Sequence, residues 1–373
     1  MKSGHRFVTW WSFVRTRGDG NDHTSILGFW IKFDVQISWY YLYFDCLSLL
    51  SSSSSHHQSF LDLKHLRTLE LSDAVLITDF SFWEVLGTLP SLENLTLEAY
   101  DPASHPAHAP ENSNSRSGNL RYFDALAMEK LNISGSVFLI QHFLGFIDSR
   151  FHWLSMLKIN LVIDRVRNGH DHAEELLTPP MKIIASKWSR SLINLFISSK
   201  PIAIDNGITH RNSRLLTSLS GLHEIRKFNL LGWTMENIDD AVRRLAKSWP
   251  KLRTFTLGLL RYLDKTFVSI STLRIIADNC LELEILDIPL DISTIPPFDD
   301  ISIKNLPHNL EVLSLGSLGG VPPPDQTILK CQIQVARCLD LIFPYLEIIS
   351  VSDEHWSEIS DLVKLCQDVR RNQ

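Results

Sequence analysis

A short apolar pattern recurs along this chain and restricts its fold more than any other feature. An apolar residue is followed by two variable positions, a second apolar residue, one variable position and a third apolar residue. The last two apolar residues are two positions apart, so both point to the same side of a strand. The ten copies begin at Leu66, Leu92, Met128, Leu154, Leu192, Ile225, Leu252, Leu283, Leu310 and Leu346. The pattern therefore predicts short strands that stack in parallel and bury one side together.

Helical patterns separate the copies, which recur every 26 to 38 residues. After Thr234, which we expect to cap a helix, apolar residues recur at spacings of three and four from Ile238 to Trp249. A period of this length has room for a strand and a helix in each repeat. We therefore expect an α/β fold: a leucine-rich-repeat solenoid of the ribonuclease-inhibitor-like horseshoe type, with parallel strands on the concave face and helices on the convex face.

Several features mark the boundaries of the repeats. Proline stands shortly before four of the strands, where it ends the preceding helix, at Pro90, Pro250, Pro307 and Pro344. The ninth position of a leucine-rich repeat usually holds Asn or Cys, but none of the ten copies has either there. The segment from Trp356 to Cys366 has an apolar period, with Lys364, Gln367 and Arg370 on its other side. This predicts a capping helix with a polar outer face.

The composition changes near residue 60. Only five of the 56 leucines precede that point, whereas 13 of the 36 aromatic residues lie there. We expect residues 1–60 to be an aromatic, Ser-rich cap or a segment that is not native. Residues 61–373 would form one irregular repeat domain of about ten repeats, with a disordered loop at residues 101–119 that is rich in Pro, Ser and His.

Composition also narrows the partners and the compartment. A net charge of −6 over 373 residues, without a long basic run, argues against nucleic acid as a partner. Charged residues interrupt the apolar stretch 26–50, so we expect neither a membrane-spanning helix nor a secretory signal. The five cysteines are widely spread and form no CxxC pair. This favours a reducing compartment, cytoplasmic or nuclear.

No residue constellation in the chain predicts catalysis. The phosphate loop GxxxxGK[ST] and the motifs HExxH, GxSxG and GxGxxG are absent, so we expect neither an enzyme nor a bound cofactor. The histidine pairs at 105 and 108 and at 170 and 172 lie in polar segments, and solvated loop histidines are the better interpretation than metal ligands. Cys331 and Cys338 are interpreted as buried structural thiols.

The remaining candidate site is the concave face, where solenoids usually bind partners. Strand residues that alternate with the buried ones would point outward there, and the candidate partner-binding residues are Glu70, Glu98, Lys130, Lys158, Asn160, Lys227, Asn229, Thr254, Thr256 and Asp287. The three lysines could form a basic stripe for an acidic protein. A solvated polar face without a partner is the alternative.

Two strand-proximal motifs, Trp249-Pro250-Lys251-Leu252 and Phe343-Pro344-Tyr345-Leu346, resemble those of F-box/leucine-rich-repeat proteins. The resemblance is greatest to members from mushroom-forming fungi and extends to residues 143–149, 186–195 and 338–346 and to the ending around Trp356 and Cys366. It covers about residues 61–373.

The resemblance implies a substrate receptor of a cullin-based ubiquitin ligase. In that family an N-terminal F-box binds a Skp-type adaptor and the repeats hold a protein target. Residues 1–60 depart from the F-box pattern, which opens with Leu-Pro and an acidic residue and ends near Cys-Arg-x-Trp. A stand-alone leucine-rich-repeat scaffold or regulatory protein without a ubiquitin link is therefore the alternative.

Overall fold

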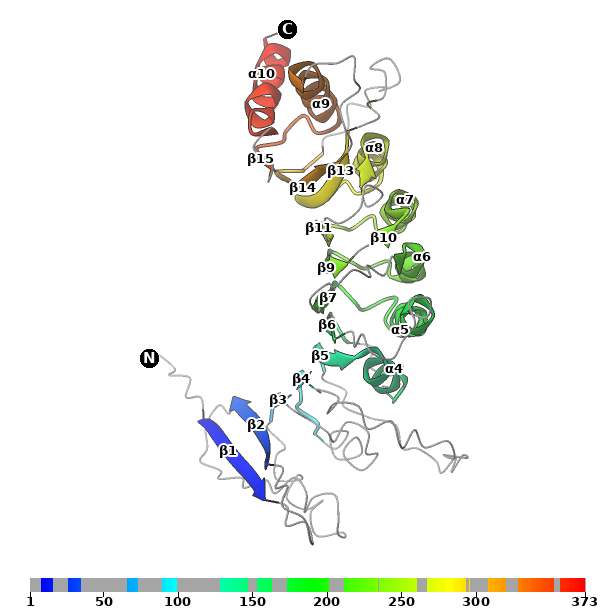
Figure 1. Ribbon diagram of the computed structural model, residues 1–373, viewed down its shortest axis with the longest axis vertical. Coiled ribbons are helices and arrows are strands. Elements are labelled where there is room, and N and C mark those ends of the chain that lie inside the picture. The colour runs from blue at the N-terminus through cyan, green and yellow to red at the C-terminus, as the bar shows by residue number, and fades with distance from the viewer. Residues whose placement is uncertain are drawn as a thin grey trace. The chain divides into compact units, whose positions relative to one another are not determined.

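The computed structural model shows an α/β protein whose strands and helices alternate along the chain (Figure 1). It describes residues 8–15, 26–34, 66–72, 89–98, 128–146, 153–162, 173–200, 211–233, 235–259, 267–292, 295, 308–319, 328–351 and 356–372. The chain divides into two compact units, Met1–Val162 (unit 1) and Ile163–Gln373 (unit 2). The predicted loop at residues 101–119 lies outside the described residues.

Unit 1 contains six strands and one helix among its described residues. These are β1 (Val8–Arg15), β2 (Ile26–Asp34), β3 (Thr68–Ser72), β4 (Asn94–Glu98), β5 (Lys130–Ser136), α4 (Val137–Phe146) and β6 (Met156–Val162). Strands β1 and β2 form an antiparallel pair, and β2 continues antiparallel to β3. From β3 to β6 the neighbouring strands run parallel. The parallel strands begin where the apolar pattern begins.

Unit 2 repeats the parallel arrangement. Its main strands are β7 (Asn194–Lys200), β9 (Lys227–Trp233), β11 (Thr254–Leu259), β13 (Ile285–Asp291), β14 (Val312–Gly319) and β15 (Ile348–Val351). All of them pair in parallel in this order. Three shorter strands are β8 (Arg211–Asn212), β10 (Met235–Glu236), which pairs with β8, and β12 (Val268–Ser269), which pairs with β13.

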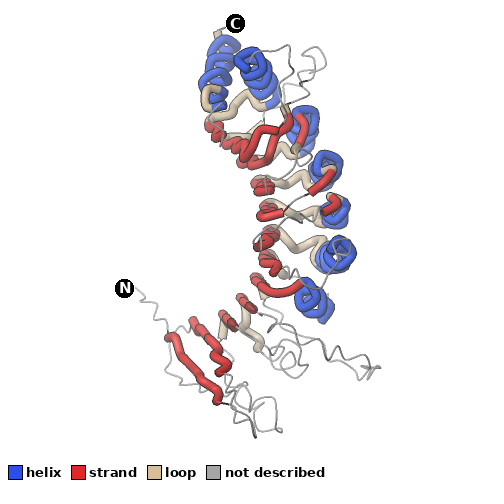
Figure 2. The backbone as a smooth tube through the Cα atoms, viewed as in Figure 1, coloured by secondary structure: helices blue, strands red, loops and turns tan. Residues whose placement is uncertain are grey.

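The helices of unit 2 lie along one side of its strands (Figure 2). They are α5 (Ala173–Lys187), α6 (Arg214–Thr217), the 3-10 turn η2 (Ser218–Gly221), α7 (Ile238–Ser248), α8 (Ile270–Asn279), α9 (Ile328–Ile342) and α10 (Ile359–Arg371). Successive helices pack on each other from α5 to α10. Each parallel strand thus has a helix available to cover its apolar side.

The register of the parallel strands confirms the alignment predicted from the apolar pattern. The middle apolar residue of each copy pairs with that of the next: Leu69, Leu95, Leu131 and Leu157 in unit 1, and Leu195, Phe228, Phe255, Leu286, Leu313 and Ile349 in unit 2. All but Ile349 are at most 5% exposed. Fully burying such a side chain contributes about 1.5–3 kcal/mol, so these continuous rows are the main source of stability.

The strands are also joined where each one starts. The N–H groups of the residue before a strand and of its first residue both donate to one carbonyl of the preceding repeat, at 2.8–3.1 Å. The accepting residues are Arg67, Glu93, Glu129, Ile193, Arg226, Arg253, Glu284 and Glu311. We call these residues, together with Glu347, the strand-start row. Each such carbonyl therefore joins the start of one strand to the repeat before it.

Two further predictions concern the turns. Leu252 N donates to Trp249 O at 3.2 Å, and Leu346 N donates to Phe343 O at 3.2 Å. Each closes a turn with proline in its second position, which confirms that proline ends the helix there. At one ninth position Trp233 is 1% exposed and so fills the core instead of bonding a turn. Its neighbour Gly232 has φ +75, and a Cβ there would collide with the carbonyl oxygen of Ser199.

One local prediction is wrong, and another is confirmed only in part. Helix α7 begins at Ile238 and is preceded by Asn237 in the left-handed conformation, so Thr234 does not cap it. Helix α10 packs on α9 as the predicted end cap, with Ile359 and Val363 buried and Lys364 exposed, but Gln367, which we expected on the polar outer side, faces inward. Gln367 is 5% exposed and donates from Nε2 to Leu346 O at 2.9 Å, whereas Leu365 and Val369 are more than half exposed. The outer face of α10 is therefore mixed, because it exposes Lys364, Asp368 and Arg371 together with Leu365 and Val369.

Candidate binding surface

The side chains opposite the buried rows form an outward surface, which we call the strand face. In unit 1 the predicted residues Glu70, Glu98, Lys130, Lys158 and Asn160 occupy alternate positions of β3 to β6. The two lysines are exposed and the other three are half-buried. Side-chain hydrogen bonds cross the strands here: Asn160 Nδ2 donates to Asn132 Oδ1 at 3.4 Å, and Asn94 Nδ2 donates to Thr68 Oγ1 at 3.2 Å.

In unit 2 the remaining predicted residues form two rows across neighbouring strands. Lys227 on β9 pairs with Thr254 on β11, and two positions later Asn229 pairs with Thr256. Thr256 in turn pairs with Asp287 on β13. The register therefore places these five residues on one side of three adjacent strands, as the alternation predicted.

The predicted basic stripe is divided between the two units. Lys130 and Lys158 lie on the adjacent strands β5 and β6, with Asn132 directly opposite Lys158. Lys227 lies in unit 2, where its strand neighbours are Asn194 and Thr254. Each unit therefore presents its own lysines, two in unit 1 and one in unit 2, as separate parts of the strand face.

Sequence reasoning missed an apolar row on the strand face of unit 2. Ile285, Val312 and Ile348 pair in register across β13, β14 and β15, which we call the terminal strands. Both isoleucines occupy variable positions of the pattern, which face outward, and they are apolar although Ile285 is 40% exposed and Ile348 is 55% exposed. The sequence does contain a signal for this row at the first outward position of each copy. That position is polar in β9 and β11, which we call the middle strands, and apolar in the three strands that follow.

The charges of the strand-start row also change between these two groups of strands. Before the middle strands the row holds Arg226 and Arg253, whereas before the terminal strands it holds Glu284, Glu311 and Glu347. Arg253 bridges forward to Glu282 at 3.2 Å and to Glu284 at 3.6 Å. In the turns nearby, Lys251 Nζ lies 2.7 Å from Glu224 Oε2. Within the described ranges, Glu311 and Glu347 form no ion pair.

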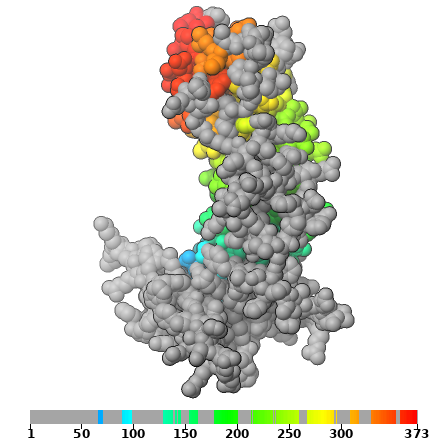
Figure 3. Space-filling view, in the orientation of Figure 1, coloured from blue at the N-terminus to red at the C-terminus, as the bar shows by residue number. Residues whose placement is uncertain are grey.

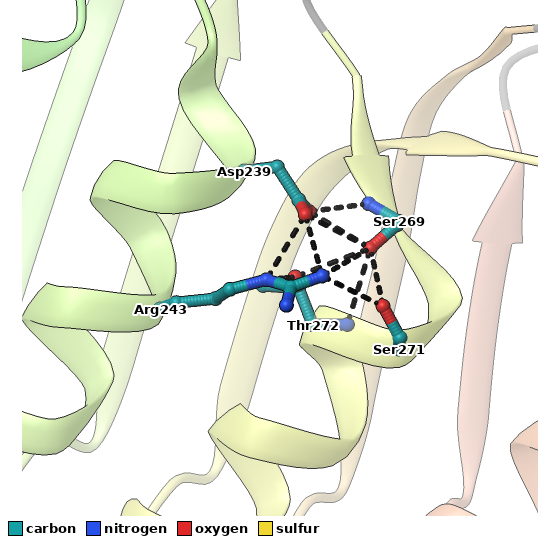
Figure 4. Close-up of polar contacts among 5 residues, drawn as sticks. All are labelled: Asp239, Arg243, Ser269, Ser271 and Thr272. Atoms are coloured by element: carbon teal, nitrogen blue, oxygen red, sulfur yellow. Dashed lines mark hydrogen bonds and ion pairs between the residues drawn. The ribbon is translucent and has the colours of Figure 1, made fainter.

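On the helix side, a polar cluster joins α7 to the start of α8 (Figure 4). Asp239 accepts hydrogen bonds from the backbone N–H and the hydroxyl of Ser269, at 2.8 and 2.9 Å. Arg243 Nε donates to Thr272 Oγ1 at 2.7 Å and to Asp239 Oδ2 at 3.0 Å, and its Nη2 donates to Ser271 Oγ at 2.8 Å. The cluster fixes two consecutive repeats relative to each other and thereby the spacing of β11 and β13.

The protonation of this cluster follows from its contacts. Burial would raise the pKa of Asp239, but hydrogen bonds from Thr272 and Ser269 and the charge of Arg243 outweigh it, so the pKa is lowered. The carboxylate therefore stays ionised and holds Arg243. Every member has a partner within the cluster, which indicates a structural role.

Other titratable groups are buried among the helices and turns. Burial raises the pKa of the Cys280 thiol to about 12 and that of Cys338 to about 11, and Cys331 on α9 is also buried. The interpretation of Cys331 and Cys338 as buried thiols is thus confirmed. Burial lowers the pKa of His308 to about 4, and its Nδ1 accepts a hydrogen bond from Leu310 N at 3.1 Å.

The described part of the chain contains no group of three or more His, Cys, Asp or Glu that could hold a metal ion. The predicted loop histidines at 105, 108, 170 and 172 lie outside it. No helix in the described ranges is both long enough and apolar enough to cross a bilayer.

Comparisons with known proteins add no relatives. No protein-family model matches the chain, and no curated protein matches it.

Proposed function

We propose that this chain is a leucine-rich-repeat protein that recognises another protein and has no catalytic activity. The observation that supports this most strongly is the register of the ten apolar copies. It gives continuous buried rows on one side of the strands and leaves the strand face on the other side for binding. The charged and polar side chains of the strand face suit a protein surface better than a small molecule, which needs a concave, largely apolar pocket.

The resemblance to F-box/leucine-rich-repeat proteins supports the narrower proposal of a target-binding receptor in a cullin ubiquitin ligase, cytoplasmic or nuclear. A Skp-type adaptor and a cullin would then be partners in addition to the protein target. The second candidate is a stand-alone scaffold or regulatory protein. The observation in its favour is the absence from residues 1–60 of the Leu-Pro-acidic opening typical of an F-box.

Affinity capture of the tagged full-length chain from its own cells, read by mass spectrometry, tests both candidates. The ligase proposal predicts recovery of a Skp-type adaptor and a cullin together with a target. A reproducible target without adaptor or cullin would favour the scaffold. Recovery of no specific protein would contradict both.

A second version of the chain separates target binding from adaptor binding. Changing Lys130, Lys158 and Lys227 together to Glu reverses the exposed charges of the strand face. If the target is acidic and binds there, the variant loses the target and keeps the adaptor. Arg244, exposed on the helix side of unit 2, provides the control: Arg244→Glu should keep both.

A further inference from the structure

The terminal strands present an apolar row at the surface that the fold does not need. The side chains of Ile285, Val312 and Ile348 point away from the core formed by Leu286, Leu313 and their neighbours. Tyr345, in the turn before β15, is 61% exposed and adds to the apolar area at this end of the sheet. In the space-filling view, the C-terminal residues (orange to red) lie at the surface at one end of unit 2 (Figure 3). Contiguous exposed apolar residues rimmed by polar ones are typical of interaction sites.

Carboxylates border this row on both sides. Glu284, Glu311 and Glu347 each stand directly before one of its three residues, and Asp287 lies two positions after Ile285. Arg253 compensates Glu284, whereas Glu311 and Glu347 are exposed and have no ion pair within the described residues. The border therefore has surplus negative charge. It favours cationic groups and disfavours phosphate-bearing surfaces such as nucleic acids and anionic membranes.

The geometry of the row limits what can occupy it. Neighbouring strands are about 4.8 Å apart, and successive turns of an α-helix rise about 5.4 Å. A helix that crosses the strands at right angles therefore places one turn over each of Ile285, Val312 and Ile348. Apolar residues spaced three or four apart would meet the row, and Lys or Arg on one flank would meet Glu311 and Glu347.

We propose that the terminal strands of unit 2 bind an amphipathic, basic helix of a partner protein, with its apolar stripe on Ile285, Val312 and Ile348 and its cations beside Glu311 and Glu347. This proposal rests on the proposed function, since it names the kind of segment that a protein-recognition module would hold at this place. A second copy of this chain is a different occupant, which the test distinguishes.

The test measures binding of a labelled helical peptide to the full-length chain by fluorescence anisotropy. The probe has Leu at positions i, i+4, i+7 and i+11 and Lys along one flank, and a peptide of the same composition in scrambled order is its control. The double variant Glu311→Lys/Glu347→Lys replaces the two carboxylates beside the apolar row with cations. The matched variant Glu93→Lys/Glu129→Lys changes the same strand-start positions in unit 1, where the polar residues Asn94 and Lys130 follow instead of Val312 and Ile348. Circular dichroism and thermal melting confirm that both variants fold.

The proposal predicts that the patterned peptide binds the unaltered chain at least about tenfold more tightly than the scrambled one. Added salt weakens the binding, and the terminal double variant loses about tenfold or more while the unit 1 variant keeps it. Equal loss in the two variants, or no binding by the unaltered chain, would overturn the proposal. A dimer in sedimentation that Glu311→Lys/Glu347→Lys dissociates would overturn it in favour of a second copy.

Capture from cells separates this failure from failure of the proposed function. If the peptide does not bind but the full-length chain still captures a target through Lys130, Lys158 and Lys227, only the terminal site is wrong. If neither the peptide nor any target binds, the protein-recognition function is also contradicted.

Discussion

The middle and the terminal strands of unit 2 share one backbone plan and differ in what they expose. Both use the same bifurcated hydrogen bonds at the strand starts and the same buried rows. In the middle strands the first two outward residues of each strand are polar, and the cations Lys251 and Arg253 are paired with neighbouring carboxylates. In the terminal strands the outward row is apolar, and Glu311 and Glu347 lack ion pairs within the described residues.

The two groups also differ in their interiors. The middle strands bury an aromatic cluster, in which the ring of Phe228 lies 5.0 Å from Trp249 and 5.8 Å from Phe255. Around the terminal strands the interior includes titratable groups: His308, and Asp340 with its partner Arg370. The shared backbone hydrogen bonds and buried rows therefore determine how the strands stack, whereas the side chains outside these rows differ between the two groups.

The substitution Leu286→Asp lies in β13, the terminal strand that pairs with the middle strand β11. Leu286 is fully buried between Phe255 and Leu313, so a charge there should cost about 5 kcal/mol in the free energy of unfolding. Ser350→Asp, which introduces the same side chain at an exposed position of β15, should change stability by less than about 0.5 kcal/mol. Chemical denaturation measures both. Equal stability of the two variants would show that the register is wrong.

His308 makes the stability of the terminal strands depend on pH. Its folded pKa of about 4 lies below the ordinary 6.5, because burial disfavours the charged ring. As pH falls, the unfolded state takes up the proton first. The stability due to the neutral ring is therefore complete above about pH 6.5 and is lost as pH falls towards 4.

The variant His308→Asn isolates this effect, since Asn can still accept from Leu310 N but does not titrate near neutrality. The stability difference between the unaltered chain and the variant should shift by about 3 kcal/mol between about pH 7 and pH 4, with the unaltered chain losing more. Denaturation curves at a series of pH values measure it. A pH-independent difference would contradict the assignment.

Arg370→Met removes the partner of a buried carboxylate at the C-terminal end. Arg370 Nη2 lies 3.1 Å from Asp340 Oδ1 and donates to Pro344 O at 2.7 Å, and the Asp340 side chain is 8% exposed. We expect a loss of about 2 kcal/mol. Arg371→Met, at a position 67% exposed, should be nearly neutral.

The pH dependence of Arg370→Met gives a second check. Burial already raises the pKa of Asp340, and loss of the guanidinium should raise it further. Since the protonated carboxyl no longer needs a cation, the destabilisation should shrink as pH falls. A destabilisation that grows at low pH would contradict the ion pair.

In the middle of unit 2, Arg243→Met removes the centre of the polar cluster between α7 and α8. Arg243 and Asp239 are about one third exposed, so we expect a loss of only about 1 kcal/mol. Arg244→Met, on the exposed side of the same helix, is the control and should be neutral. If both substitutions have the same effect on the thermal midpoint, the cluster does not join the repeats.

The smallest effect is expected for Lys251→Met in the turn before β11. Its ion pair with Glu224 is more than one third exposed on both sides and should contribute less than about 0.5 kcal/mol. High salt should abolish the difference between the variant and the unaltered chain. A larger, salt-independent loss would mean that Lys251 stabilises this turn by something other than its exposed ion pair.

The sequence predicted the buried side of this fold well, because burial imposes a period. The recurrence of spacings such as that of Leu283, Leu286 and Ile288 predicted parallel strands aligned in one register, and the structure has both. The proline turns were predictable for a similar reason, since proline restricts the backbone locally. Where the constraint was weaker, as for Thr234, a polar residue near the helix start did not decide where helix α7 begins.

For the outward side, the alternation of residues along each strand predicted only which residues point outward. Alternation placed Lys227, Asn229 and Asp287 on the strand face, but it did not say which of them would have neighbours of like character. The apolar row depends on three residues that are far apart in sequence and adjacent only in the stacked register. Likewise, the inward orientation of Gln367 depends on a carbonyl that α9 and its turn bring close to α10.

Hydrogen exchange of the full-length chain, resolved to single amides, tests the stacked register most directly. The register predicts slow exchange at the first amides of the strands in unit 2: Lys227, Thr254, Ile285, Val312 and Ile348. It also predicts that Leu286→Asp accelerates exchange in β11 and β14 as well as in β13, because each repeat is stabilised by its neighbours. Fast exchange at these amides, or acceleration confined to β13, would contradict the account.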